Sequence, residues 1–167
     1  MIAFKKPNKR LLSVAIVMIT LGFAGLGFGI YQAHSSQAEV GNTKPNFSAL
    51  LPKTKTIEQL GGWEKLTTPG GDVFYVFVDN VGGVDVNVSQ QNLPGKFKGN
   101  LSNSMTELAR AYNANNKIDV DGTKVFIGTS AKGPQSVLFA KDNVLVLMKS
   151  WANISDSDWI AYIRSLE

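Results

Sequence analysis

An uncharged, apolar stretch near the N-terminus constrains this chain more than any other feature. Residues 11–31 carry no charged side chain, and four basic residues and no acidic one precede them. A membrane-spanning helix needs about 20 apolar residues, whereas the apolar part of a cleaved signal peptide is about 7 to 15 residues long. The length therefore predicts a retained transmembrane helix over residues 11–31, after a basic tip formed by residues 1–10.

A cleaved signal peptide is the alternative interpretation of the same stretch. Ser36 and Ala38 place small residues at both critical positions of a signal-peptidase site, with Glu39 as the first residue of the mature chain. If the helix is retained, the basic residues before it predict a cytoplasmic N-terminus. The remainder of a single-pass protein in the cell membrane would then be extracytoplasmic.

The basic net charge belongs to the tip and does not extend to the outer part of the chain. The whole sequence has a net charge of +4, but all 13 acidic residues and 13 of the 17 basic residues follow residue 31. The outer part is thus neutral, and a nucleic acid is not expected as a partner because it needs a basic surface. The membrane itself and another envelope protein are the expected partners.

Three glycines within the predicted span follow a helical spacing. Gly25 and Gly29 form a G-x-x-x-G pair, and Gly22 lies one turn before Gly25. Small residues at this spacing let two membrane helices approach closely, so the pattern predicts self-association or packing with another membrane protein. Glycine is also frequent in membrane helices in general, which is the alternative explanation.

Residues 32–55 are polar and interrupted by prolines, which predicts a linker between the membrane and a folded domain. Phe47, Leu50 and Leu51 are the linker residues that could dock on this domain. The domain is predicted to cover residues 56–167. It would open with one or two helical turns, because Thr56 and Gln59 have the spacing of a capping box.

Three β-hairpins are predicted within the domain. The run of apolar residues 73–78 and the alternating valines 84, 86 and 88 predict the first two strands. Two further pairs of apolar strands flank short turn sequences, so about six strands are expected. The predicted turn residues are Asp79-Asn80 with Gly82-Gly83 in the first hairpin, Asp121-Gly122 in the second and Asp142-Asn143 in the third.

Two helices complete the predicted domain. Apolar residues at helical spacing predict a helix over residues 102–114, with Ser104 and Glu107 as its capping box. A second helix is predicted to begin after Ser155, whose side chain would cap the amide of Asp158. The fold class is therefore α+β, a mainly antiparallel sheet of about six strands with helices packed on one face.

Residues that could support catalysis or bind a metal are few. The chain has no cysteine, and its one histidine, His34, lies in the linker without a partner. Asp119 begins a sequence like that of a calcium loop, but Ser130 occupies the twelfth position, where an EF-hand needs glutamate. Ser130 and Lys132 are the remaining nucleophile–base pair, at a spacing that does not favour catalysis. No catalytic residue, cofactor or metal site is predicted.

The C-terminal part of the chain has a characteristic layout. An Asp-Gly hairpin, a strand pair ending near Ser150, and a capped helix ending in Ser165-Leu166 follow one another over residues 120–166. This layout resembles small bacterial extracytoplasmic domains of unknown function that are anchored by a single membrane helix. Some of these domains belong to proteins related to envelope stress or sigma-factor control. The resemblance implies an anchored domain and carries no catalytic residue.

The function expected from these observations is non-catalytic binding of an envelope partner by the extracytoplasmic domain. A small-ligand or lipid-binding domain is the main alternative, in which the apolar runs 73–78 and 144–148 would line a cleft. A secreted protein would result from cleavage near Ala38. An enzyme using Ser130 and Lys132 is the third hypothesis.

Overall fold

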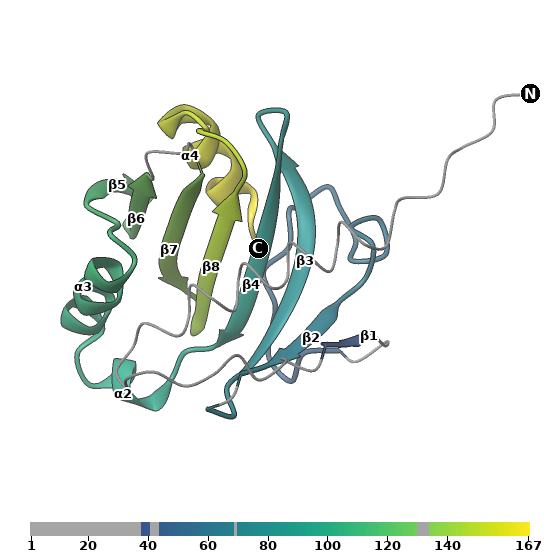
Figure 1. Ribbon diagram of the computed structural model, residues 1–167, viewed down its shortest axis with the longest axis horizontal. Coiled ribbons are helices and arrows are strands. Elements are labelled where there is room, and N and C mark those ends of the chain that lie inside the picture. Colours follow the sequence, from purple (N-terminus) through teal and green to yellow (C-terminus); the bar gives the residue numbers. More distant parts are fainter. Residues whose placement is uncertain (1–37, 41–43, 69, 130–133) are drawn as a thin grey trace, which may run out of the picture.

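The computed structural model describes residues 38–40, 44–68, 70–129 and 134–167 (Figure 1). The predicted basic tip and transmembrane helix, with Gly22, Gly25 and Gly29, lie outside the described residues. Among the helices of the described ranges, none combines the length and the apolar character needed to cross a bilayer. The membrane anchor therefore stays a prediction.

A single antiparallel sheet forms the centre of the fold. Its eight strands follow the order β1-β2-β3-β4-β8-β7-β6-β5 (Figure 1). Strands β3 to β8 confirm the three predicted hairpins, while β1 and β2 extend the sheet beyond the six strands expected. The bounds are Ala38–Val40 (β1), Glu64–Thr67 (β2), Val73–Val81 (β3), Val84–Asn92 (β4), Asn116–Val120 (β5), Thr123–Thr129 (β6), Gln135–Lys141 (β7) and Val144–Ser150 (β8).

The second and third hairpins turn where the sequence predicts. Asp121 and Gly122 have φ angles of 51° and 86°, and Asp142 and Asn143 have φ angles of 50° and 62°. Positive φ at both central residues defines the type I′ turn, whose twist matches that of the flanking strands. The choice of Asp, Asn and Gly at these four positions therefore fixes both turns.

The first hairpin turns later than the sequence analysis predicts. Strand β3 continues through Asp79 and Asn80 to Val81, and the turn consists of Gly82 and Gly83. The prediction of Asp79-Asn80 as turn residues was wrong, because Asp79 occupies an inward position of the strand. Asp79 and Phe77 are two residues apart, so their side chains lie on the same face of the strand, and Asp79 is buried there.

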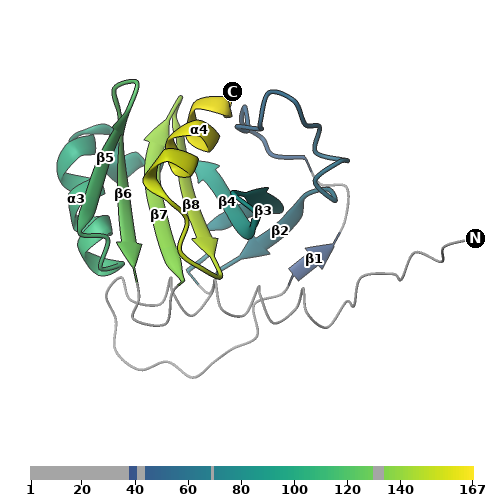
Figure 2. The same ribbon diagram turned by 90° about the horizontal axis from the view of Figure 1, so that it is seen from above.

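Helices cover both faces of the sheet, so the prediction that they pack on one face was wrong. Helix α4 (Asp156–Ser165) packs on the face that includes Phe77 and Val146, whereas α2 (Gly95–Lys98) and α3 (Leu101–Ala111) pack on the face that includes Leu138 (Figure 2). We call these surfaces the α4 face and the α3 face.

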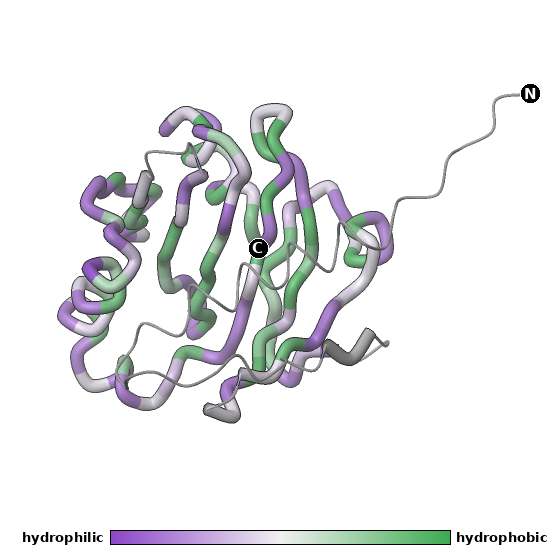
Figure 3. Tube along the Cα trace, in the orientation of Figure 1, coloured by the Kyte–Doolittle hydropathy of each residue, from purple (hydrophilic) through white to green (hydrophobic). Residues whose placement is uncertain are grey.

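Both faces of the sheet are covered because several strands carry apolar residues at consecutive positions. Val76 and Phe77 point to opposite faces of β3, yet they are only 3% and 2% exposed. Hydrophobic stretches of this kind run along β3 and β8 (Figure 3). A strand with such a sequence needs apolar partners above and below, as strands buried on both faces do.

The two predicted helix starts have different outcomes. In α4 the predicted cap is confirmed, because the Asp158 amide donates to Ser155 Oγ at 3.2 Å. In α3 the predicted capping box was wrong. The N-cap is Asn100, whose Oδ1 accepts from the Asn103 amide at 3.2 Å, and Ser104 lies within the helix. Asn is as good an N-cap as Ser, so the earlier position begins the helix.

Residues 44–63, which we call the strap, lie against the α4 face. Leu50 is buried there, and Phe47 and Leu51 pack around it, which confirms the docking expected of these three residues. The backbone of Leu51 exchanges two hydrogen bonds with that of Glu167, at 2.9 and 3.0 Å. Residues that the sequence analysis assigns to the linker, up to residue 55, thus take part in the folded unit.

Candidate binding site

A buried polar network fixes the connection between β8 and α4. Gln135 Oε1 accepts hydrogen bonds from the Ile154 amide at 2.8 Å and from Trp159 Nε1 at 3.0 Å. Ser150 Oγ accepts from the Gln135 amide at 3.1 Å and donates to the Ala152 carbonyl at 2.6 Å. Side chains of the sheet therefore bond to the backbone of the connection at Ala152 and at Ile154, which holds it in place.

Trp151 lies on this fixed connection and projects into solvent. The residue is 46% exposed, although its neighbour Ser150 is 1% exposed and Ile154 is 5% exposed. Tryptophan combines a large apolar surface with one hydrogen-bond donor, and it is enriched among the residues that dominate binding energy at protein interfaces. Because the connection is already ordered, a partner that binds Trp151 loses little affinity to ordering it.

Two acidic residues follow Trp151 and indicate the kind of surface that would complement it. Asp156 and Asp158 lie in the first turn of α4, immediately after the connection, and both are exposed. A complementary surface would offer an apolar pocket for the indole and basic groups at its rim. Opposite charges at the rim of an interface raise the association rate and exclude wrong partners.

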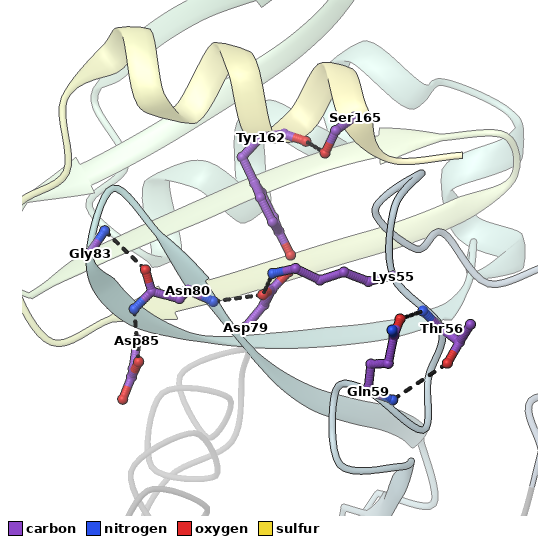
Figure 4. A network of polar contacts seen from close by, with 9 residues as sticks. All are labelled: Lys55, Thr56, Gln59, Asp79, Asn80, Gly83, Asp85, Tyr162 and Ser165. Carbon is purple, nitrogen blue, oxygen red and sulfur yellow. Dashed lines mark hydrogen bonds and ion pairs between the residues drawn. The ribbon is translucent and has the colours of Figure 1, made fainter.

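A second polar cluster joins three segments on the α4 face (Figure 4). The Asp79 carboxylate, whose side chain is 2% exposed, accepts hydrogen bonds at Oδ1 from Lys55 Nζ and from the Asn80 amide. The hydroxyl of Tyr162 points from α4 toward the same carboxylate (Figure 4). Lys55 belongs to the strap, Asp79 to β3 and Tyr162 to α4.

The electrostatics of this cluster keep Tyr162 protonated. Burial raises the pKa of the Tyr162 phenol well above its usual range, and the negative charge of Asp79 raises the pKa further. A neutral phenol beside a carboxylate paired with an ammonium group is a stable arrangement of charges. The cluster is thus suited to holding the strap and α4 against β3.

The other residues considered in the sequence have plain structural roles or lie outside the description. Asp119 Oδ1 accepts from the Gly122 amide at 2.8 Å, so this residue closes the β5–β6 turn. His34, Ser130 and Lys132 lie outside the described residues, as do the three glycines of the predicted span. Within the described ranges, no group of three or more acidic or histidine side chains is arranged to hold a metal ion.

Both apolar runs that a lipid-binding cleft would use are packed inside the protein. Phe77 in the first run and Val146 in the second belong to the cluster beneath α4. Phe74 and Leu147 belong to the cluster beneath α3. These side chains line the contacts between the sheet and its two covers.

Sequence analysis missed the polar residues that organise the α4 face. Gln90 and Gln135 were not singled out, and Asp79 was assigned to a turn, although each of the three is more than nine-tenths buried. The signal that could have found Asp79 is strand periodicity, because it occupies the same parity as Phe77 once the turn is placed at Gly82-Gly83. Gln135 has no comparable signal, since it is the first residue of its strand.

Comparisons with known proteins do not place this chain in a family. No protein-family model matches it, and neither the curated proteins nor the solved structures include a match. The resemblance drawn from residues 120–166 therefore stays a prediction.

Proposed function

We propose that this chain is a single-pass membrane protein that presents its α+β domain outside the membrane to bind another envelope protein, without catalysis of its own. The observation that carries the proposal is Trp151, a large aromatic residue exposed to solvent on a connection that hydrogen bonds to Ser150 and Gln135 hold in place. The partner would contribute an apolar pocket with a basic rim.

The cellular location in this proposal rests on the sequence. Residues 11–31 have the length of a membrane-spanning helix, and the basic residues before them favour a cytoplasmic N-terminus. Because the strap is held against the sheet by Leu50 and Lys55, the polar segment between membrane and domain would be shorter than the sequence predicts. The domain would therefore be presented close to the membrane surface.

Site-specific photocrosslinking in intact cells tests the binding surface. A photoreactive phenylalanine derivative replaces Trp151 in the full-length chain, and the same derivative replaces Ser102 on the exposed side of α3 as a matched control. We expect a discrete adduct with another envelope protein from position 151 and none from position 102. Equal patterns at the two positions, or no adduct at 151, would contradict the proposal.

A quantitative test follows once the adduct is identified. Trp151→Ala should weaken binding of that protein by about tenfold or more, which is the usual loss for a dominant interface residue. Ser102→Ala should leave the affinity unchanged. Thermal unfolding of both variants at the wild-type temperature would show that the loss does not come from misfolding.

A further inference from the structure

The outer edge of β5 is one end of the sheet. Among the described strands, β5 pairs with β6 alone and is the last strand of the sheet, at the end opposite to β1 (Figure 1). Asn116, Lys117 and Asp119 on this strand are exposed, and Ile118 is half-buried against the α4 face. An edge strand presents free backbone donors and acceptors, which another strand can pair with.

The turn that follows β5 decides which residues offer their backbone to such a partner. In a type I′ turn the residues that flank it, here Val120 and Thr123, exchange backbone hydrogen bonds. Hydrogen bonding to β6 then alternates along the strand, so that Lys117 and Asp119 direct their backbone groups away from β6. In agreement, the Lys117 amide donates to Asn116 Oδ1 at 2.9 Å.

The charges on these two residues select one pairing register for a second copy of the chain. If a two-fold axis passes through Ile118, Lys117 of each copy lies opposite Asp119 of the other. This register also uses the free backbone groups of both residues, which would form the hydrogen-bonded pairs of an antiparallel ladder. Centring the axis on Lys117 or on Asp119 instead places like charges opposite one another.

Packing on the α4 face is consistent with the same register. Ile118 already contacts the cluster beneath α4, and the axis would bring it beside Ile118 of the second copy. Directly opposite residues that do not share hydrogen bonds are the most closely spaced pairs of an antiparallel sheet. The half-buried edge of the cluster would thereby be covered.

We propose that β5 pairs antiparallel with β5 of a second copy about a two-fold axis at Ile118, so that the two sheets become one. Each Asn116 side chain would turn away from the Lys117 amide to let the ladder form. This inference goes beyond the proposed function, because it concerns the β5 edge, whereas Trp151 lies between β8 and α4. Two chains held in one membrane would meet at a raised effective concentration, which favours a short ladder of this kind.

The absence of cysteine from the chain makes disulfide trapping specific. Ile118→Cys is introduced into the full-length protein in membranes, and mild oxidation is followed by non-reducing electrophoresis. At the two-fold axis the paired residues have a Cα spacing within the range that a disulfide allows. We therefore expect a covalent dimer from Ile118→Cys.

Asn116→Cys is the matched control on the same strand. In the proposed register the two copies of residue 116 are displaced by about 14 Å along the strands, too far for a disulfide. Equal dimer yields at 116 and 118 would overturn the proposed register. A disulfide-linked adduct of Ile118→Cys with a different protein, in place of the dimer, would overturn the choice of partner.

Charge reversal provides the second arm of the test. Lys117→Glu and Asp119→Lys, each combined with Ile118→Cys, replace two attractive pairs with repulsive ones and should each weaken dimerisation by roughly tenfold. Co-expression of the two variants with different tags should restore a mixed dimer, because each residue then opposes an opposite charge. Unchanged crosslinking in the single variants, or no recovery in the mixture, would overturn the proposal.

Folding controls keep these outcomes interpretable. Each variant is compared with the wild type by thermal unfolding under reducing conditions, because Asp119→Lys also removes the side-chain bond to the Gly122 amide. Photocrosslinking from position 151 is repeated on Lys117→Glu. A lost dimer with an intact adduct at 151 separates this inference from the proposed function.

Discussion

The two faces of the sheet hold their covers by different means. On the α4 face, buried side chains of the strands form hydrogen bonds with the covering segments: Gln90 with Leu50 of the strap, and Gln135 with Ile154 before α4. On the α3 face, Leu108 and its helical neighbours pack on an apolar surface of the strands. The chain that leaves α3 then passes directly over Gly128.

This difference follows from what each cover needs. The strap and the β8–α4 connection have few backbone partners of their own, so buried side chains must supply them. A helix satisfies its own backbone and can be held by apolar contacts alone. Polar residues in a sheet core can therefore mark the places where irregular segments dock.

The largest effect is expected for the hydrogen bonds between Gln90 and the strap. Gln90 is fully buried, and its side chain accepts from the Leu50 amide at 2.9 Å and donates to the Leu50 carbonyl at 2.6 Å. Gln90→Leu leaves both backbone groups unpaired and should lower the free energy of unfolding by about 3 kcal/mol. Chemical denaturation measures this loss.

The neighbouring Gln91 is a matched control for this experiment. It points to the opposite face and is half-buried. Gln91→Leu should change the free energy of unfolding by less than about 0.5 kcal/mol. If Gln90→Leu were as mild as Gln91→Leu, the hydrogen bonds to the strap would not be what holds the cover on the α4 face.

A somewhat smaller effect is expected at the close approach on the α3 face. A Cβ atom on Gly128 would lie 2.9 Å from the Tyr112 carbonyl oxygen and 3.0 Å from that of Asn113. Gly128→Ala must displace this backbone and should cost about 2 kcal/mol of stability. Gly99→Ala is the control, because no atom lies within 4 Å of its Cβ position and its φ of −79° suits any residue. Equal melting temperatures for the two variants would show that the passage over Gly128 is not tight.

The second and third turns and the start of α4 could be predicted because neighbouring residues determine them. Features that depend on contacts between distant parts of the chain could not be predicted. Asp121-Gly122 and Asp142-Asn143 indicate type I′ turns because few other residues adopt positive φ. By contrast, Asp79-Asn80 has the same two residue types as Asp142-Asn143 but remains in β3. Pairing with β4 and the bond to Lys55 override its local preference for a turn.

The choice of face could not be predicted from the sequence. Leu108 and Ile163 lie in similar amphipathic patterns, and nothing in either pattern states which side of the sheet its helix covers. For the candidate site, Trp151 is visible in the sequence, but its exposure depends on Gln135, a residue remote in sequence. Hence only the structure shows that Trp151 is presented to solvent.

A third prediction concerns alkaline pH and again compares the two faces. Burial raises the pKa of Tyr162 on the α4 face and of Tyr112 after α3. The unfolded chain loses these protons near the ordinary tyrosine pKa of about 10, while the folded chain retains them. The free energy of unfolding should therefore fall as the pH rises above about 10, by about 1 kcal/mol for each tyrosine at pH 11.

Single variants assign this loss to its tyrosine. Tyr162→Phe and Tyr112→Phe should each reduce the slope of stability against pH between pH 10 and 11, as measured by denaturation at each pH. A slope that neither variant changes would contradict the raised pKa values.

The smallest expected effect concerns a half-buried carboxylate on β2. Burial raises the pKa of Glu64 on β2, so ionisation is less favourable in the folded state than in the unfolded one. Stability should therefore fall as the pH rises past the ordinary glutamate pKa, and Glu64→Gln should slightly raise the melting temperature at pH 7. The pKa of exposed Glu58 is lowered by a hydrogen bond to its own backbone and then by a hydrogen bond to the Thr56 side chain. Glu58→Gln should therefore lower the melting temperature at pH 7. A common sign for both variants would argue against the partial burial of Glu64.

The intact mass and the location of the full-length chain test the proposed membrane presentation most directly. A C-terminally tagged protein is expressed, separated into membrane and secreted fractions, and weighed by mass spectrometry. Retention of the predicted helix over residues 11–31 requires the full-length mass in the membrane fraction. A chain that begins at Glu39 in the secreted fraction would contradict it, and the domain would then act as a released protein.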